Sequence, residues 1–368
     1  MQNPYARAMD LSKNFVYASS PSRVIFGKGT IKQLPSEISR QCLKAPLLLS
    51  TPNQVSQAET LKKILNGNIA GIFAEATMHT PINITEKALE YAKSISADSI
   101  ISIGGGSTIG LGKALSIRTS LPHICIPTTY AGSEMTPILG ETADGVKKTR
   151  SDPKILPGTV IYDVDLTMTL PPSMSATSGV NAIAHAVEAL YAQNTNPIIS
   201  LLALEGTKAL AAALPQIVNM PNDVEARTEA LYGAWLCGLC LGSVGMSLHH
   251  KLCHTLGGSF NLPHAETHTI VLPHALAYNS SEIPGVMVKL AEVLPGSDGD
   301  AIKGLNVLLG NLKVERGLKN FGMKEEDVDK AANIAVSNPY WNPRRVEKEG
   351  VRELIRRAWA GEQAKADL

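Results

Sequence analysis

Short apolar runs alternate with amphipathic helical patterns through the first half of this chain, and that alternation limits its fold most strongly. Residues 45–50, 69–73, 99–103 and 123–126 have the length and composition of buried strands. Between the second and third runs, residues 84–96 predict an amphipathic helix with Thr85 as its N-cap. Strands separated by helices pair in parallel through right-handed crossovers. We therefore expect an α/β domain built on a mostly parallel sheet.

The pattern changes at the sequence Leu170-Pro-Pro-Ser. Beyond it, Ala/Leu-rich segments such as 181–193 and 197–214 predict long helices. We therefore expect two domains, a dinucleotide-binding α/β domain over residues 1–169 and an all-α substrate and catalytic domain over residues 170–368. A chain of 368 residues is long enough to bury a core in each.

Charge and composition exclude several classes of partner. The net charge of +1 gives no electrostatic basis for binding nucleic acid or an anionic membrane. The N-terminal residues 1–13 have no apolar signal segment, and the longest apolar stretch, 233–248, is glycine-containing and too short to span a membrane. We expect a cytoplasmic protein. Its odd number of cysteines argues against a disulfide framework, and Cys237 and Cys240 are interpreted as small core residues rather than a zinc or redox pair.

A glycine-rich turn marks a candidate phosphate site. Gly104, Gly105, Gly106 and Ser107 follow an apolar strand and precede the helical pattern of 109–117. At such a junction the free N–H groups and the helix dipole favour a phosphate, and glycine lets it approach the backbone closely. A tight turn without a ligand would show the same residues. The turn also lies far from the first β-α connection, unlike the usual dinucleotide fingerprint.

Hydroxyl groups supply further candidate cofactor contacts. Thr128, Thr129 and Ser133 follow another apolar strand and can reach ribose or phosphate oxygens, although hydroxyls that cap a loop would fit the same sequence. The segment around Thr51 offers neither an acid for a ribose 2′-hydroxyl nor an arginine for a 2′-phosphate, which predicts weak discrimination between NADH and NADPH. Lys148 could reach the cofactor, the alternative being an ordinary solvated lysine.

Histidines at helical spacing mark a second candidate site. Asn181 and His185 are four residues apart, as are His250 and His254, so each pair shares a helix face; a glycine turn can then return His264 toward them. Such an array suits a divalent metal or a polarised carbonyl substrate, although each histidine alone could be an ordinary buried polar group. The amide of Asn181 lacks the charge on which hard metals depend, whereas three histidines can still hold Zn²⁺. Residues without this spacing are interpreted as structural, namely His249, His268 and His274.

The combination of motifs resembles the iron-dependent alcohol dehydrogenase family, and within it the maleylacetate reductase branch, over residues 15–361. The matching motifs are GGGS, TTxxGSE, NAxxHAxE, HHxxxHTLGGxxxxPHA and LPHALAYN. The resemblance implies the dehydroquinate synthase-like fold of that family. Metal-using relatives carry Asp at position 181 and ligand histidines at positions 185, 250 and 264. Here position 181 is Asn, the TTxxGSE loop is one residue shorter, and GGGST replaces GGGSP, as in the branch understood to work without metal.

By resemblance, the chain would use NADH or NADPH to reduce the enone double bond of maleylacetate, a small dicarboxylate, to 3-oxoadipate, without metal and as a homodimer. His254 and His250 would polarise the ketone and donate a proton. The substrate would be oriented by Asn181, His185, His264 and Tyr340.

Three other functions stay open at this point. A metal-dependent alcohol or polyol dehydrogenase of the same fold would require stoichiometric Fe²⁺ or Zn²⁺. A lyase of the dehydroquinate synthase type would need an additional array of lysines and acids near the histidines, which the sequence lacks. A non-catalytic binding protein would have no reason to keep both the glycine turn and the histidine spacing.

Overall fold

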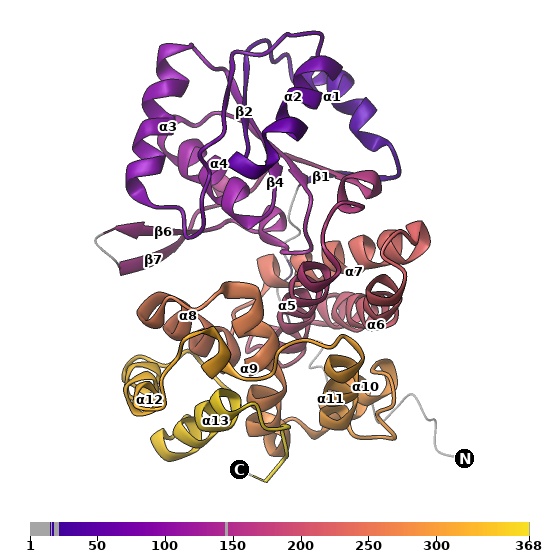
Figure 1. Ribbon diagram of the computed structural model, residues 1–368, viewed down its shortest axis with the longest axis vertical. Coiled ribbons are helices and arrows are strands. Elements are labelled where there is room, and N and C mark those ends of the chain that lie inside the picture. The colour runs from indigo at the N-terminus through magenta and orange to yellow at the C-terminus, as the bar shows by residue number, and fades with distance from the viewer. Residues whose placement is uncertain (1–14, 16, 18–21, 144–145, 368) are drawn as a thin grey trace. The chain divides into compact units, whose positions relative to one another are not determined.

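The computed structural model describes residues 15, 17, 22–143 and 146–367 and divides into two compact units (Figure 1). One unit, Ser20–Leu170, contains the strands and is called the α/β unit below. The other includes Pro171–Leu368 and is called the helical unit. The division falls at the proline pair that follows Leu170, and the N-terminal segment 1–13 lies outside the described residues.

The α/β unit is built on a six-stranded parallel sheet with the strand order β1-β8-β5-β4-β2-β3. Its strands are β1 (Arg23–Gly27), β2 (Pro46–Leu49), β3 (Gly71–Phe73), β4 (Ser99–Gly104), β5 (His123–Pro127) and β8 (Thr159–Asp163). The predicted parallel sheet is therefore confirmed. Strand order reverses between β2 and β4, and open α/β sheets bind ligands at the carboxyl ends of strands beside such a reversal.

Helices cover both faces of this sheet: α1 (Leu34–Arg40), α2 (Val55–Ile64), α3 (Ile82–Ser94) and α4 (Gly106–Thr119). Neighbouring residues of a strand point to opposite faces. Leu48 thus joins a core with α1 and α2, whereas Leu47 and Leu49 join a core with α3 and α4. Burial on both faces explains why these strands are continuous apolar runs.

One local prediction fails in this unit, and some of its strands were not predicted. Thr85 is not an N-cap: α3 begins at Ile82, after the extended residue Pro81, and Thr85 lies buried within the helix with its hydroxyl facing the Pro81 carbonyl oxygen. The predicted strands also did not include β1, or an antiparallel hairpin of β6 (Ile138–Ala143) and β7 (Val146–Ser151). The hairpin strands are mostly polar and half-exposed, so they lack the apolar run that identifies a buried strand.

The helical unit contains α5 (Pro172–Tyr191), α6 (Pro197–Asn219), α7 (Val224–Ser243), α8 (Leu248–Phe260), α9 (His264–Asn279), α10 (Pro284–Val293), α11 (Ala301–Asn311), α12 (Asp327–Ser337) and α13 (Lys348–Ala360). Several begin at side-chain caps, since Asn196, Asp223 and Asp300 accept hydrogen bonds from the first amides of α6, α7 and α11. Helix α5 packs against α6, α7 and α9, and α8 packs against α9.

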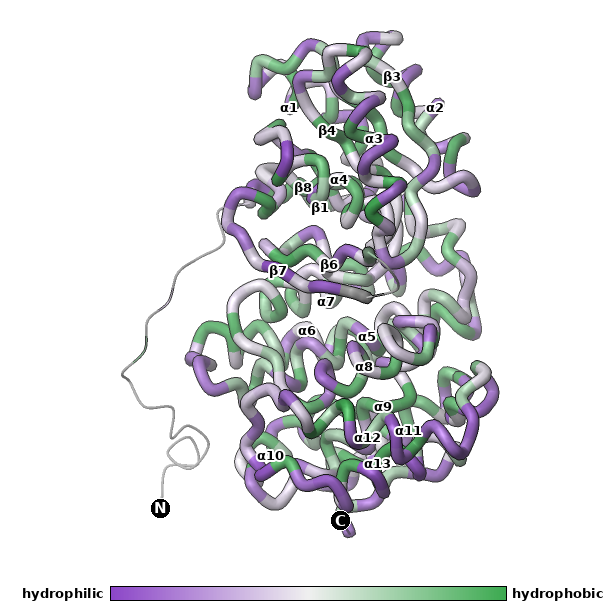
Figure 2. Tube along the Cα trace, turned by 90° about the vertical axis from the view of Figure 1, so that its left-hand side faces the viewer, coloured by the Kyte–Doolittle hydropathy of each residue, from purple (hydrophilic) through white to green (hydrophobic). Residues whose placement is uncertain are grey.

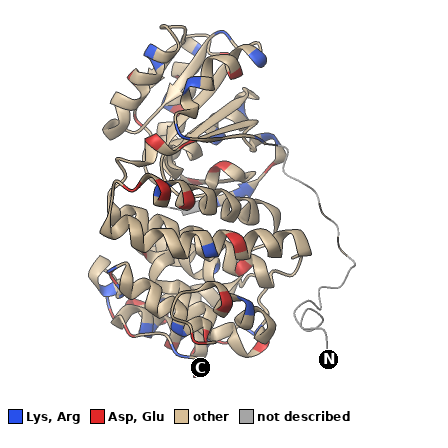
Figure 3. Ribbon diagram, turned by 90° about the vertical axis from the view of Figure 1, so that its right-hand side faces the viewer, with Lys and Arg blue, Asp and Glu red and all other residues tan. Residues whose placement is uncertain are grey.

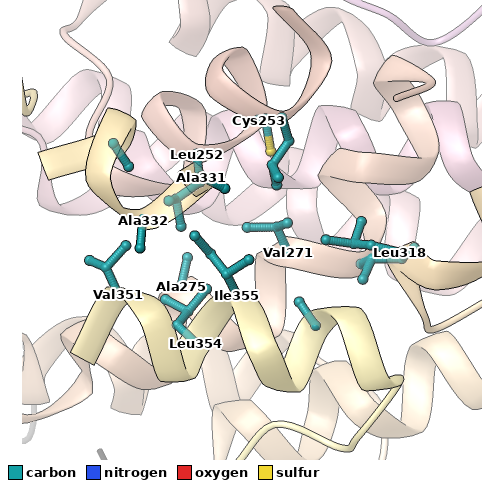
Figure 4. Packing of buried hydrophobic residues seen from close by; sticks show 14 of the residues in the cluster. Leu252, Cys253, Val271, Ala275, Leu318, Ala331, Ala332, Val351, Leu354 and Ile355 are labelled. Carbon is teal, nitrogen blue, oxygen red and sulfur yellow. The ribbon is translucent and has the colours of Figure 1, made fainter. Parts of the chain in front are cut away.

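One face of α8 belongs to an apolar core. Figure 4 shows Leu252 of α8 among side chains from α9, α12 and α13, including Val271, Ala331 and Ile355. Along the tube in Figure 2, hydrophobic and hydrophilic residues alternate within single helices, the pattern of amphipathic helices. Because this core fixes the position of α8, the remaining face of the helix can present polar side chains with a defined geometry.

The long apolar segments of the helical unit belong to its interior, as do Cys237 and Cys240. Helix α6 is long and apolar enough to cross a membrane, but 56% of its most apolar window is buried within the protein, as in a core helix. The stretch 233–248 is divided between α7 and α8, which meet at 94°. Cys237 and Cys240 are free and buried, and burial raises the pKa of both thiols, to about 12 for Cys240. Basic and acidic residues are interspersed in the view of Figure 3.

Candidate active site

Three helices of the helical unit bring six histidines together. Their rings lie in chains of contacts with centroid separations of 4.3 to 6.2 Å. We call this set the histidine cluster: His185 from α5, His249, His250 and His254 from α8, and His264 and His268 from α9. The predicted proximity of positions 185, 250, 254 and 264 thus has a structural counterpart, and two histidines that the spacing did not group lie among them.

A chain of hydrogen bonds runs through one edge of the cluster. Asn181 Nδ2 lies 3.3 Å from His185 Nε2, and His185 Nδ1 lies 2.9 Å from His250 Nε2. His250 Nδ1 lies 2.7 Å from Oε2 of Glu188. Asn181, His185 and Glu188 are spaced i, i+4, i+7 on α5, so they form one stripe of that helix. All four side chains are buried.

Glu188 anchors this chain and the start of α8 at the same time. Its Oε2 accepts a hydrogen bond from the Ser247 amide at 2.8 Å, and its Oε1 accepts one from the His249 amide at 2.7 Å. Tyr191 Oη donates to Oε1 at 3.5 Å. Since every partner of the two oxygens is a donor, the geometry is that of an ionised carboxylate, placed where a helix N-terminus favours negative charge. Sequence analysis missed this residue, although it ends the NAxxHAxE motif at helical spacing.

The position of the Glu188 carboxylate determines which ring nitrogens of His250 and His185 carry a proton. An acceptor at His250 Nδ1 places a proton on that nitrogen, which leaves the Nε2 lone pair to accept from His185 Nδ1–H. His185 Nε2 then accepts from the Asn181 amide. Each imidazole therefore donates in the direction of Glu188, and the tautomers follow from the hydrogen-bond pattern.

This arrangement does not fit a divalent metal. His185 uses one nitrogen to accept and the other to donate, so it offers no lone pair to an ion. Asn181 supplies a neutral amide where a ligand carboxylate would contribute charge. Its Oδ1 is buried and has no hydrogen-bond partner among the described residues. A hydrogen-bonding substrate or water would satisfy that oxygen without a cation.

A second group of possible metal ligands, two histidines and a cysteine, lies next to this chain. His249, Cys253 and His268 have ligand atoms within 4.8 Å of one another. His249 Nε2 and His268 Nδ1 share a hydrogen bond of 3.0 Å, so one of them carries a proton. Burial lowers the pKa of both histidines well below the usual value, with a further contribution from neighbouring imidazoles, and burial raises the pKa of the Cys253 thiol. In the absence of an ion, burial therefore favours neutral imidazoles and a protonated thiol in this group.

Tyr340 reaches the cluster from a loop after α12. Its hydroxyl lies 3.1 Å from His254 Nδ1, and burial together with the Glu188 charge raises the pKa of the phenol. Tyr340, predicted as a donor to the substrate, thus contacts a predicted catalytic histidine. His264 contributes its ring to the cluster, 4.3 Å from that of His268. His274 has no ring contact with the cluster among the described residues, and burial lowers its pKa to about 4.

In the α/β unit, the predicted cofactor residues gather at the carboxyl ends of β2, β4 and β5. Gly104 ends β4 with a φ of +146°, and Gly106 opens α4, which also contains Ser107. The Thr128 amide donates to the Gly104 carbonyl oxygen at 3.0 Å. A Cβ atom on Gly105 would lie 3.0 Å from the Thr129 side chain. The turn is thus packed against the second predicted loop and leaves the amides at the start of α4 for a phosphate.

Gln54, which the sequence analysis passed over, connects these loops. Its Nε2 donates to Thr128 Oγ1 at 3.0 Å, and its Oε1 accepts from Thr51 Oγ1 at 3.1 Å. A Cβ atom on Gly104 would approach the same Oε1 to 2.8 Å. Thr51, which we also predict from the sequence to contact the cofactor, therefore lies at the same edge of the sheet as Thr128. The edge presents amide and hydroxyl groups, with no carboxylate in this network.

Lys113 holds the loop that contains Ser133. Its buried Nζ donates to the Ser133 carbonyl oxygen at 2.5 Å, to Thr136 Oγ1 at 2.9 Å and to the Ile138 carbonyl oxygen at 2.9 Å. Burial lowers its pKa to about 8 despite the nearby Glu134 carboxyl. Lys148 instead lies exposed on β7, opposite Glu141, and its contact with a cofactor stays a prediction.

Sequence comparison places both units in one family. Residues 21–164 match the iron-containing alcohol dehydrogenase family, and residues 175–359 match the C-terminal region of the Fe-containing alcohol dehydrogenase family. The chain therefore belongs to the iron-containing alcohol dehydrogenase family, a family of oxidoreductases, which confirms the resemblance described above.

Among the curated relatives, maleylacetate reductase of Rhizobium sp. (strain MTP-10005) is 51% identical over 94% of this chain and 98% of its own. The enzyme of the same name from Sphingobium indicum is 50% identical over the same shares. The solved structure of maleylacetate reductase from Agrobacterium tumefaciens is 50% identical, with a TM-score of 0.91 over 95% of this chain and 99% of that chain. A structure described as a putative alcohol dehydrogenase from Ralstonia eutropha JMP134, also 50% identical, reaches 0.95 over 96% of this chain and 100% of its own.

Proposed function

We propose that this protein is a maleylacetate reductase that transfers hydride from NADH or NADPH and works without a metal. The observation that carries the proposal is the hydrogen-bonded chain from Asn181 through His185 and His250 to Glu188. It uses imidazole nitrogens that a metal-dependent relative would direct at an ion. Relatives of the same name at about half identity over nearly the whole chain support the substrate.

In the proposed reaction, a bound NADH or NADPH would supply a hydride, which would add to the alkene carbon β to the ketone of maleylacetate. The electron pair of the double bond moves toward the ketone, giving an enolate, and a proton then adds to the carbon next to the ketone. The products are 3-oxoadipate and the oxidised cofactor. The protein must therefore stabilise one negative oxygen and deliver one proton.

We assign polarisation of the ketone to His254 and His250, and proton delivery to His254. If the Tyr340 hydroxyl donates its hydrogen bond to His254 Nδ1, the single N–H of the neutral ring lies on Nε2, and we assign that N–H to the substrate. His250 donates to Glu188 through Nδ1 and accepts from His185 at Nε2, so its proposed contact with the ketone requires that the hydrogen bond from His185 gives way. Asn181, with its unsatisfied buried Oδ1, is assigned with His185 and His264 to substrate orientation.

For the cofactor, we propose binding at Gly104, Gly105, Gly106 and Ser107, with contacts from Thr51, Thr128, Thr129 and Ser133 and a further contact from Lys148. The amide and hydroxyl groups of the sheet edge favour neither a 2′-hydroxyl nor a 2′-phosphate strongly, which supports use of both NADH and NADPH. We also propose a soluble cytoplasmic homodimer that binds neither nucleic acid nor membrane; light scattering of the purified protein tests the dimer.

The decisive experiment follows oxidation of NADH and of NADPH with enzymatically generated maleylacetate, in buffer with and without EDTA, and measures bound metal on the same sample. We expect the same turnover in both buffers with substoichiometric metal. Activity confined to simple alcohols, restored by Fe²⁺ or Zn²⁺ after chelation, would instead identify a metal-dependent alcohol dehydrogenase of the same fold.

A further inference from the structure

Lys251 is a cation beside the histidine cluster to which the proposed reaction assigns no role. It is the single lysine of α8 and lies between His250 and His254 in sequence. Its Nζ lies over the ring of Tyr340, 5.6 Å from the centroid, and the hydroxyl of the same ring contacts His254. Lys251 and His254 therefore meet the same tyrosine and share one side of α8.

The charge of Lys251 has no carboxylate partner in the described part of the chain. No Asp or Glu oxygen lies within 4.0 Å of its Nζ there, and the side chain is half-buried. Burial also lowers the pKa of its ammonium group. A partly desolvated cation gains from an anionic ligand more than a solvated one does, because the interaction is less screened.

The loop that carries Tyr340 is fixed to α9, so the position of the phenol beside Lys251 is well defined. Asn342 and Asn279 exchange two amide hydrogen bonds, of 2.9 and 2.7 Å. The Arg344 guanidinium stacks on the Tyr278 ring at 4.3 Å and donates to the Tyr278 carbonyl oxygen at 2.8 Å. Arg344 is thereby engaged with α9, whereas Lys251 has no carboxylate partner in the described part of the chain and lies directly over the Tyr340 ring.

We infer that Lys251 is the residue that binds a carboxylate of the substrate, at a position next to the ketone held by His254. The inference rests on the proposed function and names the part of the substrate that this site recognises. Residues three apart on a helix have Cβ atoms about 5–6 Å apart. That spacing suits the carboxylate that one methylene group separates from the ketone, rather than the carboxylate across the alkene.

The test compares Lys251→Met and Lys251→Arg on two substrates, maleylacetate and 4-oxopent-2-enoate, which lacks the carboxylate next to the ketone. For maleylacetate we expect Lys251→Met to lower kcat/KM about 10- to 100-fold, mainly through KM, since hydrogen bonds to charged groups are of that strength. Lys251→Arg should retain most of the activity. On 4-oxopent-2-enoate, the wild type and Lys251→Met should differ by less than about threefold.

Lys330→Met is the matched control, because Lys330 stacks on Phe260 at the other end of α8 at the same 5.6 Å. Lys330→Met should leave kcat/KM unchanged for both substrates. Equal losses on the two substrates, or no loss on either, would overturn the carboxylate role. Circular dichroism of each variant shows whether it is folded, and Lys251→Gln replaces the Met variant if it is not.

Binding of 3-oxoadipate by calorimetry separates this inference from the proposed function. If the wild type fails to reduce maleylacetate yet binds the dicarboxylate at least 10-fold more tightly than Lys251→Met does, the carboxylate site stands and the proposed reaction falls. If the wild type reduces maleylacetate but the two proteins bind 3-oxoadipate equally, the proposed function stands and Lys251 is not the carboxylate ligand. If neither activity nor binding is found, both proposals are wrong.

Discussion

Replacing Glu188 with Gln should destabilise the helical unit and slow turnover together. The two carboxylate oxygens accept from two backbone amides, His250 Nδ1 and Tyr191 Oη. A glutamine of the same shape presents one oxygen and one NH2 group, so at one end a donor would face donors. Removing one member of a buried, charge-assisted network typically costs about 3–5 kcal/mol. For a unit of this size that is a fall in the unfolding midpoint of roughly 10 °C.

The catalytic consequence follows from the same contacts. Without an acceptor at Nδ1, His250 loses its fixed tautomer, and the hydrogen bond from His185 loses its direction. Losing a carboxylate that orients a functional histidine typically costs 10- to 100-fold in activity, so we expect kcat to fall by about that factor at a temperature where Glu188→Gln is folded. Glu188→Asp, which keeps the charge, should recover part of both effects. The control is Glu292→Gln on an exposed face of α10.

A Glu188→Gln protein with an unfolding midpoint within about 1 °C of the wild type and unchanged kcat would refute this reasoning. It would mean that the carboxylate is neither the cap of α8 nor the acceptor that orients His250. Differential scanning calorimetry and steady-state kinetics on the same preparation provide both measurements.

Three further predictions concern the metal, the buried lysine and the glycine turn. Asn181→Asp should restore the anionic ligand and retain stoichiometric Zn²⁺ or Fe²⁺ after dialysis, measured by mass spectrometry, whereas equal metal retention by the wild type would contradict our account of the cluster. Lys113 has a pKa of about 8 in the folded state and about 10.5 in the unfolded chain. Between these pH values only the unfolded chain holds the proton, so the free energy of unfolding should rise with pH, by about 3 kcal/mol in total. Lys113→Met should remove that part of the slope in urea titrations, and an unchanged slope would show that the ammonium is not buried. Gly104→Ala should lower the unfolding midpoint, because the φ of +146° at this position is strained for alanine and the added Cβ would lie 2.6 Å from Thr108 Oγ1. Gly106→Ala should be tolerated, because a Cβ there would have nothing within 4 Å. Similar unfolding midpoints for the two variants would argue against this backbone geometry.

Hydrophobic periodicity predicted the strands that are buried on both faces. Leu47, Leu48 and Leu49 lie in a strand covered on both faces, so burial leaves an apolar run that sequence reveals directly. The hairpin at 138–151 is polar and half-exposed, and its register comes from cross-strand hydrogen bonds, which leave no such run. Thr85 shows why helix ends are hard to predict from sequence. A threonine near a helix start is a reasonable N-cap candidate, but α3 begins three residues earlier, at Ile82 after Pro81.

In the histidine cluster, spacing within one helix could be inferred from sequence and contacts between helices could not. The separations of Asn181 from His185 and of His250 from His254 predict shared faces. His268 joins His249 only because α8 and α9 cross at that point, a consequence of tertiary packing. The spacing of Glu188 from His185 could also have been read from the sequence. Its contact with the amides at the start of α8 could not, because that contact depends on how two helices pack.

The position of the negative charge explains how this cluster can differ from a metal centre while keeping most of the same residues. An acid at position 181 would place a charge next to the ring of His185 and favour a cation between the imidazoles. Here the charge lies at Glu188, about two turns further along α5 than position 181 and beyond His250, so it is balanced by protons on nitrogen and by the amides at the start of α8. The imidazole protons then all point toward Glu188, and the Asn181 amide completes the chain as a donor. A single exchange of carboxylate for amide thus changes what these imidazoles stabilise, from a bound cation to an ordered chain of hydrogen bonds that ends at Glu188 and holds His250 beside His254.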